Sequence, residues 1–271
     1  MLSDEEWRTL LLEGAEARLP AINATEYRKH ADQLSFASPA MLACEDGEEY
    51  WVKHMIVSDG CMPTTRTAQI GGMVTDHVIG SLAPKIIEDV VPAIRLVSIP
   101  SDLIAVAPRL QNACPGLAHG SRNASRNCTG KASVTDFGHF NLPFNRPRFA
   151  GLAVLYGLSL ASDHQVIYRM DGEPVVFSVD HGHFLPNGPN WTAAACSARH
   201  DGVLDPHVIT ACALTHDELA ASMDRLGRLT ATDVARAVAA PPDEWWFPVA
   251  DRIAMARFLW ARREAILGVA A

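Results

Sequence analysis

The sequence predicts an α+β protein of two lobes, in which a small lobe with a sheet and one helix precedes a mainly helical lobe. Three observations lead to this prediction. Strand-like patterns gather before residue 100, one hairpin pattern follows residue 163, and helical periodicity dominates from about residue 206. We place the boundary between residues 111 and 112, so that the lobes span 1–111 and 112–271.

In the small lobe, Ser3 and Glu6 form a capping-box pattern that opens a helix. A turn at Asp46-Gly47 separates two strand-like runs. The predicted elements, in order, are a helix over 4–18, strands between 24 and 55 with a loop at 31–39, a helix over 67–83, and one or two strands over 90–100.

The second lobe begins with a segment, 112–147, that is rich in Gly, Asn, Ser and Pro, and we expect it to be long and irregular. An apolar helix and the hairpin follow, and the remainder is helical. The predicted helices of this lobe are 148–161, 215–226, 230–239 and 249–267.

Composition excludes several classes of protein. The chain has 271 residues, and its 48% hydrophobic and 20% charged content is typical of a globular protein. A net charge of −8 disfavours nucleic-acid binding, which needs a basic surface. The six cysteines form no CxxC pair, which disfavours a zinc site or a disulfide framework. With no signal-peptide pattern and no membrane-length apolar run, we expect a cytoplasmic protein without a membrane partner.

Two carboxylates bracket the predicted hairpin. Asp163 precedes its first strand (166–168), and Asp180 follows its second (175–179), with a turn at Asp171-Gly172. Phosphoryl transfer needs one carboxylate to orient and deprotonate the acceptor hydroxyl, and another to hold the metal ion that bridges the ATP phosphates. The pattern therefore favours a phosphotransferase in which Asp163 is the catalytic residue and Asp180 the metal ligand.

The run Asp180-His181-Gly182-His183 also allows a competing interpretation, because imidazoles and carboxylates bind transition metals. If the run continues the strand, however, His181 points away from Asp180 and His183. No outlying set of ligands stands out in the sequence. We therefore favour phosphoryl transfer over a hydrolytic metal centre.

Lys53 lies within the strand pattern at 50–55, between apolar neighbours. A lysine on a rigid strand can direct its ammonium group at nucleotide phosphates. The alternative is an edge-strand lysine that faces water. Asp76, in the next predicted helix, could pair with Lys53 and hold it toward the phosphates, and its alternative is a solvated helix charge.

Two further segments bear on nucleotide binding. Asp136-Phe137-Gly138 spells the metal-binding tripeptide of kinases, but no apolar strand precedes it, so we do not assign it a metal. The loop at 31–39 contains no Gly to cover phosphates. The segment 115–122 has small residues and a basic one, so His119 and Ser121 are candidate nucleotide contacts, and the alternative is a plain surface loop.

Taken together, these motifs resemble the HipA-like kinase family, a bacterial branch of the protein kinase-like fold, over residues 22–265. The most specific part is the Asp-His-Gly-His run followed by Trp-Thr. The matching segments are Tyr50-Trp51-Val52-Lys53, Val74-Thr75-Asp76, the PGLxHGS pattern from Pro115 to Ser121, Asp163-His164-Gln165, Val179 to Phe184, and Gly188-Pro189-Asn190-Trp191-Thr192.

The resemblance implies a phosphotransferase that uses ATP and Mg²⁺, with a protein Ser or Thr as acceptor. It implies that Lys53 contacts the ATP phosphates, that Asp163 is catalytic, and that Asp180 binds metal. The family pattern has Arg after the catalytic Asp and a metal-binding Asn soon after it, whereas this chain has His164 and no Asn before Tyr168. Gln165, the one nearby amide, is therefore a candidate metal and nucleotide ligand.

Two alternatives remain open at this stage. The missing Asn and the Gly-free loop also fit a nucleotide-binding pseudokinase that acts as a binding module. A small-molecule kinase would use the same hairpin. The sequence does not identify the acceptor, the biological role or the oligomeric state.

Overall fold

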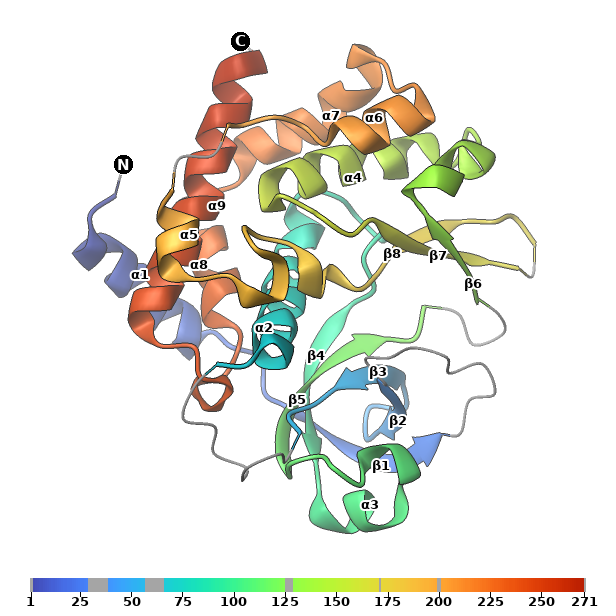
Figure 1. Ribbon diagram of the computed structural model, residues 1–271, viewed down its shortest axis with the longest axis vertical. Helices are drawn as coiled ribbons and strands as arrows, with labels where there is room; N and C mark the ends of the chain where they lie inside the picture. The colour runs from blue at the N-terminus through green and yellow to red at the C-terminus, as the bar shows by residue number, and fades with distance from the viewer. Residues whose placement is uncertain are drawn as a thin grey trace.

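The computed structural model describes residues 2–28, 39–56, 66–124, 129–170, 172–198 and 201–270. Its elements combine a closed β-barrel, a small second sheet and a set of helices (Figure 1). The strands are β1 (Ile22–Arg28), β2 (Ala40–Cys44), β3 (Glu49–Lys53), β4 (Ile94–Ile99), β5 (Gly116–Arg122), β6 (Thr129–Ser133), β7 (Gln165–Arg169) and β8 (Val176–Ser178).

The helices confirm the predicted α+β character. They are α1 (Asp4–Glu16), α2 (Ala68–Leu82), α3 (Ser101–Val106), α4 (Arg146–Ser159), α5 (Ala193–Ser197), α6 (Pro206–Cys212), α7 (His216–Arg228), α8 (Ala231–Ala239) and α9 (Val249–Ala270). The capping box of Ser3 and Glu6 is present at the start of α1. Among the described residues, no helix is both long and apolar enough to cross a membrane.

The first five strands form the barrel, in the order β1-β2-β3-β5-β4. A short parallel pairing of β1 with β4 closes it, and the other neighbours are antiparallel. In β3 burial alternates, so Tyr50 and Val52 enter the core while Lys53 is turned the other way. The segment after β4 closes one end of the barrel, because Leu103 of α3 and Leu110 belong to the same core.

The segment 112–147 is not the irregular stretch that we predicted. It contains β5, which pairs with both β3 and β4, and β6, which pairs with β7. Gly120 explains part of the error, because a Cβ there would lie 2.5 Å from Val97 Cγ2. A glycine in this strand therefore marks a close approach of neighbouring chains rather than a loop.

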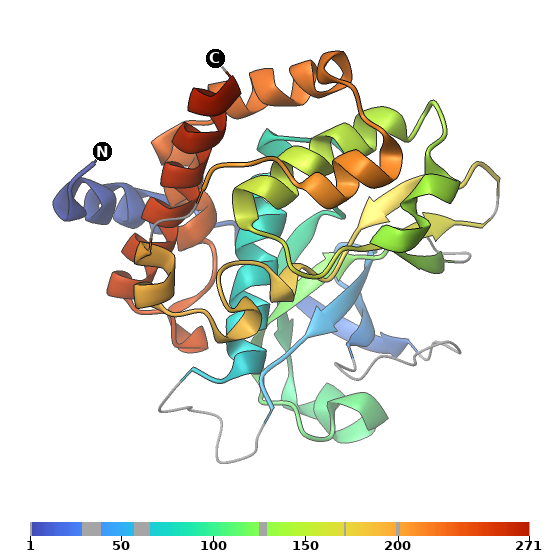
Figure 2. The ribbon, with the colours of Figure 1, turned by 45° about the horizontal axis from the view of Figure 1, so that its top comes forward.

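The hairpin that we predicted is formed by β7 and β8, and β6 extends it to a three-stranded sheet. Beside this sheet lies α4, whose residues from Phe149 to Ser159 are all buried (Figure 2). An apolar helix of this kind is stable only when neighbours cover every face. Here α6, α7 and α9 complete the cover.

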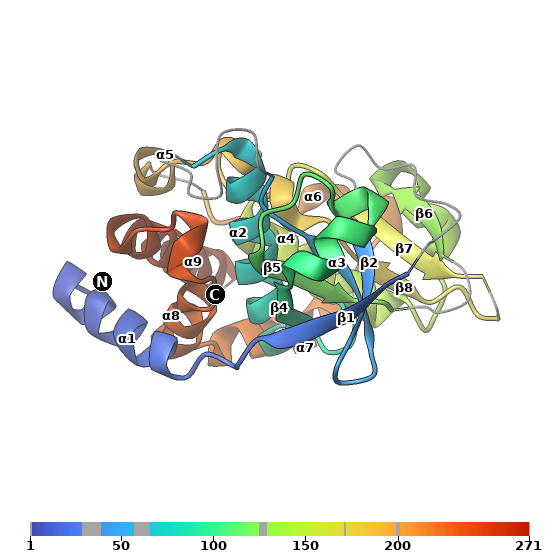
Figure 3. The same cartoon turned by 90° about the horizontal axis from the view of Figure 1, so that it is seen from below.

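The chain's first helix packs on its last ones, since α1 contacts α8 and α9 (Figure 3). Trp7 and Leu11 are buried in the same core as these helices. The lobe division at 111/112 stays a prediction, with α1 packed on helices of the second lobe and β5 part of the barrel.

Helix α2 forms the junction between the barrel and the helices. It contacts β4 and β5 on one side, and α8 and the two 3₁₀ turns η4 (His181–His183) and η5 (Gly188–Asn190) on others. Glycines allow α2 to lie close to the turns η4 and η5. A Cβ on Gly71 would lie 2.1 Å from the carbonyl oxygen of Pro189, and one on Gly182 would lie 3.2 Å from Cα of Gly72.

Candidate active site

Lys53 is held between two carboxylates. Its Nζ lies 2.5 Å from Oδ2 of Asp76 and 2.6 Å from Oδ1 of Asp180. The three residues come from different places: the end of β3, the middle of α2, and the turn after β8. The structure therefore brings together the lysine, the helix carboxylate and the hairpin carboxylate that the sequence singled out.

The charges of this triad support one another. Burial alone would lower the pKa of Lys53, but the carboxylates of Asp76 and Asp180 outweigh it and raise that pKa above its ordinary value. The lysine is therefore a cation at any physiological pH. Only 3% of the Asp76 side chain is exposed, against 33% for Asp180, so Asp180 is the carboxylate that faces solvent.

Asp180 has an unusual backbone conformation, with φ 62° and ψ 54°. This left-handed conformation is uncommon for a residue with a side chain, and it often occurs at functional sites. Here it ends the hairpin and starts η4, and the carboxylate meets Lys53. The run 181–183 is thus a 3₁₀ turn and not the continued strand on which we had based the orientation of His181.

Asp163 lies at the same end of the hairpin as Asp180. Val166 pairs with Ser178, and the amide of Val179 donates to the carbonyl of Gln165, so the residues before β7 and after β8 are neighbours. Asp163 is half-buried, and its Oδ2 accepts a hydrogen bond of 2.7 Å from the side-chain amide of Gln165. Gln165, a candidate metal ligand, thus contacts the candidate catalytic residue.

His164, the residue after Asp163, is buried, and its Nε2 lies 2.7 Å from Oδ2 of Asp205. Asp205 also caps α6 by accepting from the amide of Val208. The pair ties the loop that carries Asp163 to the helical core. The sequence contained a signal that we did not use, since Asp205-Pro206 is a typical helix start.

His119 does not sit on a loop. It belongs to β5, it is buried, and its Nδ1 lies 3.1 Å from Nδ1 of His77 on α2. Burial, reinforced by the nearby Lys53 ammonium, lowers the pKa of His119 to about 3, so it is neutral. Ser121, the other candidate of this segment, is half-buried opposite Trp51.

A cavity of about 700 Å³ opens beside the triad. Lys53, Asp180 and the first half of α2 line one part of it, and Pro108, Arg109, Gln111 and Asn112 line another. Its size is within the range of small-ligand sites. The described residues that line it include none of His119, Ser121, Gln165 and Asp163, so the lining of this cavity does not support the predicted roles of these four residues.

The donor set fits magnesium better than a transition metal. In the part of the chain that the structure describes, no group of three or more His, Cys, Asp and Glu side chains is arranged to hold a metal ion. Magnesium does not need such a cage, because it binds through one or two carboxylates together with water and substrate phosphates. The partly exposed carboxylate of Asp180 at the cavity wall has this character.

The tripeptide Asp136-Phe137-Gly138 has a local structural role. Asp136 accepts from the backbone of Ser133 and forms a capping box at the 3₁₀ helix η3 (Val134–Phe140), while Phe137 is fully buried.

One supporting contact could not be foreseen. The Arg66 guanidinium lies 3.6 Å from the Trp191 ring centroid and 2.6 Å from Oδ2 of Asp251. The indole nitrogen of Trp191 donates to the carbonyl of Gly71. These contacts join the start of α2 to α9 and so help to position Asp76.

No family model matches the sequence, and no curated protein sequence matches it. The crystal structure of the proinflammatory kinase CtkA from Helicobacter pylori is similar, with a TM-score of 0.58 and 10% identity over 93% of this chain and 96% of that one. A structure of the Golgi casein kinase is more distant, with a TM-score of 0.45 and 9% identity over 98% of this chain and 77% of that one. The similarity to the first of these structures shows that the chain has a protein kinase-like fold.

Proposed function

We propose that the protein is a phosphotransferase that uses ATP and Mg²⁺, with the bilobal arrangement of a kinase. The observation that carries the proposal is the contact of one lysine with two carboxylates from separate elements at the wall of a cavity. A lysine that only stabilises the fold needs a single carboxylate partner. A lysine held by a buried carboxylate and aimed beside a solvent-facing one suits a cation that must meet phosphates.

In this proposal each residue has a separate task. Lys53 contacts the ATP phosphates, and Asp76 holds the lysine in place. Asp180 binds Mg²⁺, which supplies charge neutralisation at the phosphates when it is bound. Asp163 accepts the proton of the acceptor hydroxyl, and its hydrogen bond from Gln165 fixes the orientation of its carboxylate.

The finer parts of the proposal rest on the resemblance to the HipA-like family. A protein Ser or Thr is the proposed acceptor, and the cytoplasm the proposed location. A small-molecule acceptor would need the same triad, so the contacts of Lys53 do not distinguish a small-molecule acceptor from a protein Ser or Thr.

A second candidate is a nucleotide-binding pseudokinase. The observation that favours it is the contact of Gln165, whose amide is directed at Asp163 and which replaces an Asn in the family pattern. A weakened second metal ligand would permit nucleotide binding without efficient transfer.

The test is release of ADP and phosphate from ATP, since water can replace the unknown acceptor, together with transfer to the protein itself. We expect Asp163→Asn to reduce both at least a hundredfold while ATP affinity changes less than threefold. Asp136→Asn is the matched control and should retain activity, because Asp136 caps η3. Full activity of Asp163→Asn would refute the assigned role, and an inactive wild-type protein that binds Mg-ATP would favour the pseudokinase.

A further inference from the structure

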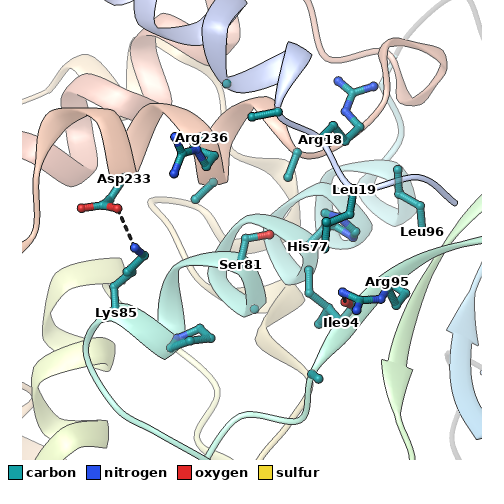
Figure 4. A pocket seen from close by; sticks show the side chains of 17 residues that line it. Arg18, Leu19, His77, Ser81, Lys85, Ile94, Arg95, Leu96, Asp233 and Arg236 are labelled. Atoms are coloured by element: carbon teal, nitrogen blue, oxygen red, sulfur yellow. Dashed lines mark hydrogen bonds and ion pairs between the residues drawn. The ribbon is translucent and has the colours of Figure 1, made fainter. Parts of the chain in front are cut away.

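A second cavity, of about 320 Å³, lies at the other half of α2 (Figure 4). Of α2, Ala68, Gln69, Gly72 and Met73 line the first cavity, whereas His77, Gly80 and Ser81 line this one. The end of α1, strand β4 and helix α8 form its other walls. The two cavities share no lining residue among those described, so the second is a separate site.

Apolar and cationic side chains both line this cavity. Leu19, Ile94 and Leu96 contribute apolar surface. Four basic side chains surround it, and Figure 4 shows them approaching from different sides. They are Arg18, Lys85, Arg95 and Arg236.

Three of these cations already hydrogen-bond to protein groups, Arg95 only through its Nη1, which lies 3.5 Å from the carbonyl oxygen of its neighbour Ile94. Lys85 lies 2.8 Å from Asp233, the one acidic residue of the described lining, and Arg18 donates to the carbonyls of Ala239 and Pro241. Arg95 and Arg236 form no ion pair with any described residue. In a chain with a net charge of −8, this is a local excess of positive charge that an anion would compensate.

We infer that this cavity binds a small anion with an apolar body, such as a carboxylate or phosphate on a ring or short chain. The apolar part lies against Ile94 and Leu96, and the negative group lies near Arg95 and Arg236. Arginine suits this task because its planar group pairs with carboxylate and phosphate oxygens. The volume fits a small ligand and is too small for a folded partner.

The cavity is also connected to the candidate active site through α2. His77, in its wall, directly follows Asp76 and contacts His119, the residue opposite Lys53 in the strand register. The ring of Trp245 also packs against His77, with ring centroids 5.4 Å apart. An occupant would therefore restrain the helix segment that holds Asp76.

The test uses 8-anilinonaphthalene-1-sulfonate, an anion with an aromatic body, and N-phenyl-1-naphthylamine, the same rings without the sulfonate. Fluorescence titration of the full chain should show one saturable site, with the uncharged probe bound at least tenfold more weakly. Arg95→Ala combined with Arg236→Ala should weaken sulfonate binding at least tenfold. Arg228→Ala, an exposed arginine on α7, is the matched control and should change nothing.

A second variant distinguishes loss of the binding site from loss of the fold. Ala17 is exposed at the cavity wall, so Ala17→Phe should fill the cavity and exclude both probes while leaving the melting temperature nearly unchanged. Hydrogen exchange then locates the site. The bound sulfonate should slow exchange in 77–82 of α2 and 236–239 of α8, but not in the segment 108–112 beside the first cavity.

Three results would overturn the inference. They are absence of saturable sulfonate binding, equal affinity in the double arginine variant, and protection confined to the first cavity. Each of these readouts is independent of ATP, so a failure here is distinct from a failure of the proposed phosphotransferase.

Discussion

The ammonium group of Lys53 and the carboxylate of Asp76 depend on each other for their burial. Asp76 is 3% exposed, and a charge taken so far from water is stable only beside an opposite charge. Asp180 differs, because its side chain is one-third exposed and water can replace the lysine. The same contacts that would bind a nucleotide therefore also stabilise the fold, but unequally.

Lys53→Met should consequently destabilise the protein as well as remove nucleotide binding. The loss leaves Asp76 as an uncompensated buried charge, which costs about 3–5 kcal/mol of unfolding free energy. Lys85→Met is the control, because Lys85 is half-exposed and its pair with Asp233 contributes about 1 kcal/mol or less. Urea unfolding measures both, and equal losses would contradict this account of Asp76.

Two buried histidines near the triad predict acid sensitivity. Burial lowers the pKa of His181 to about 4 and that of His119 to about 3, whereas an unfolded histidine titrates near 6.5. Below pH 6.5 the unfolded chain therefore takes up protons that the folded chain does not. The free energy of unfolding should fall by about 1.4 kcal/mol per pH unit for each, from pH 6.5 down to the folded pKa.

Urea unfolding between pH 7 and 4 tests this prediction. The His119→Asn variant should show a shallower decline with acid than the wild type, even if its stability at pH 7 is lower. His216→Asn, which changes an exposed histidine, should follow the wild-type slope. A wild-type curve that is flat between pH 6.5 and 4 would refute the buried neutral state of these side chains.

At this scale the sequence was informative where local context was distinctive. Lys53 stood alone among apolar strand residues, and Asp163 and Asp180 flanked one hairpin. The contact between His77 and His119 could not be predicted, because it joins a helix and a strand 42 residues apart. Its existence depends on how α2 is rotated against β5, and no local pattern specifies that rotation.

Among the elements, α2 has the most demanding packing. It carries Asp76, forms part of both cavities, and approaches the segment 182–191 through glycines. Glycine is unfavourable inside a helix, so the close contact with Pro189 compensates for a weak helical sequence. The position of α2 is thus determined by tertiary contacts.

Gly71→Ala should therefore destabilise the protein although alanine favours helix. The new methyl group would meet the carbonyl oxygen of Pro189, 2.1 Å away in the present arrangement, and overpacking of this kind costs about 1–3 kcal/mol. Gly227→Ala in α7 is the matched control, because nothing lies within 4 Å of its added Cβ, and it should gain up to about 1 kcal/mol. Thermal unfolding compares them, and a stabilised Gly71→Ala would contradict the packing described.

The balance between local sequence preference and tertiary contacts also explains which elements the sequence predicted. Helices with strong caps and clear periodicity, such as α1, α7 and α8, were recognised close to their true bounds. The strands β5 and β6 were missed, because their Gly, Ser and Lys residues resemble a loop. These strands are stabilised by their neighbours in the sheets, and intrinsic propensity contributes little.

On the scale of the whole molecule, the candidate site exists only where the barrel meets the helices. Lys53 belongs to the barrel, while Asp76 lies on a helix whose apolar side chains enter the other core. A ligand that contacts both the barrel and the helices therefore stabilises their packing against each other as well as the fold of each. The lobe division expected from the sequence did not anticipate that α1 would pack on the C-terminal helices.

The most direct test of the central claim is the melting temperature with ATP, with and without Mg²⁺. At a hundredfold excess over its dissociation constant, Mg-ATP should add about 2.7 kcal/mol of stability and raise the melting temperature by roughly 5–10 °C. Asp180→Asn should abolish the magnesium-dependent part of the shift, and Asp136→Asn should keep it. A wild-type protein that is not stabilised by ATP with Mg²⁺, or an Asp180→Asn protein stabilised as much as the wild type, would contradict the claim.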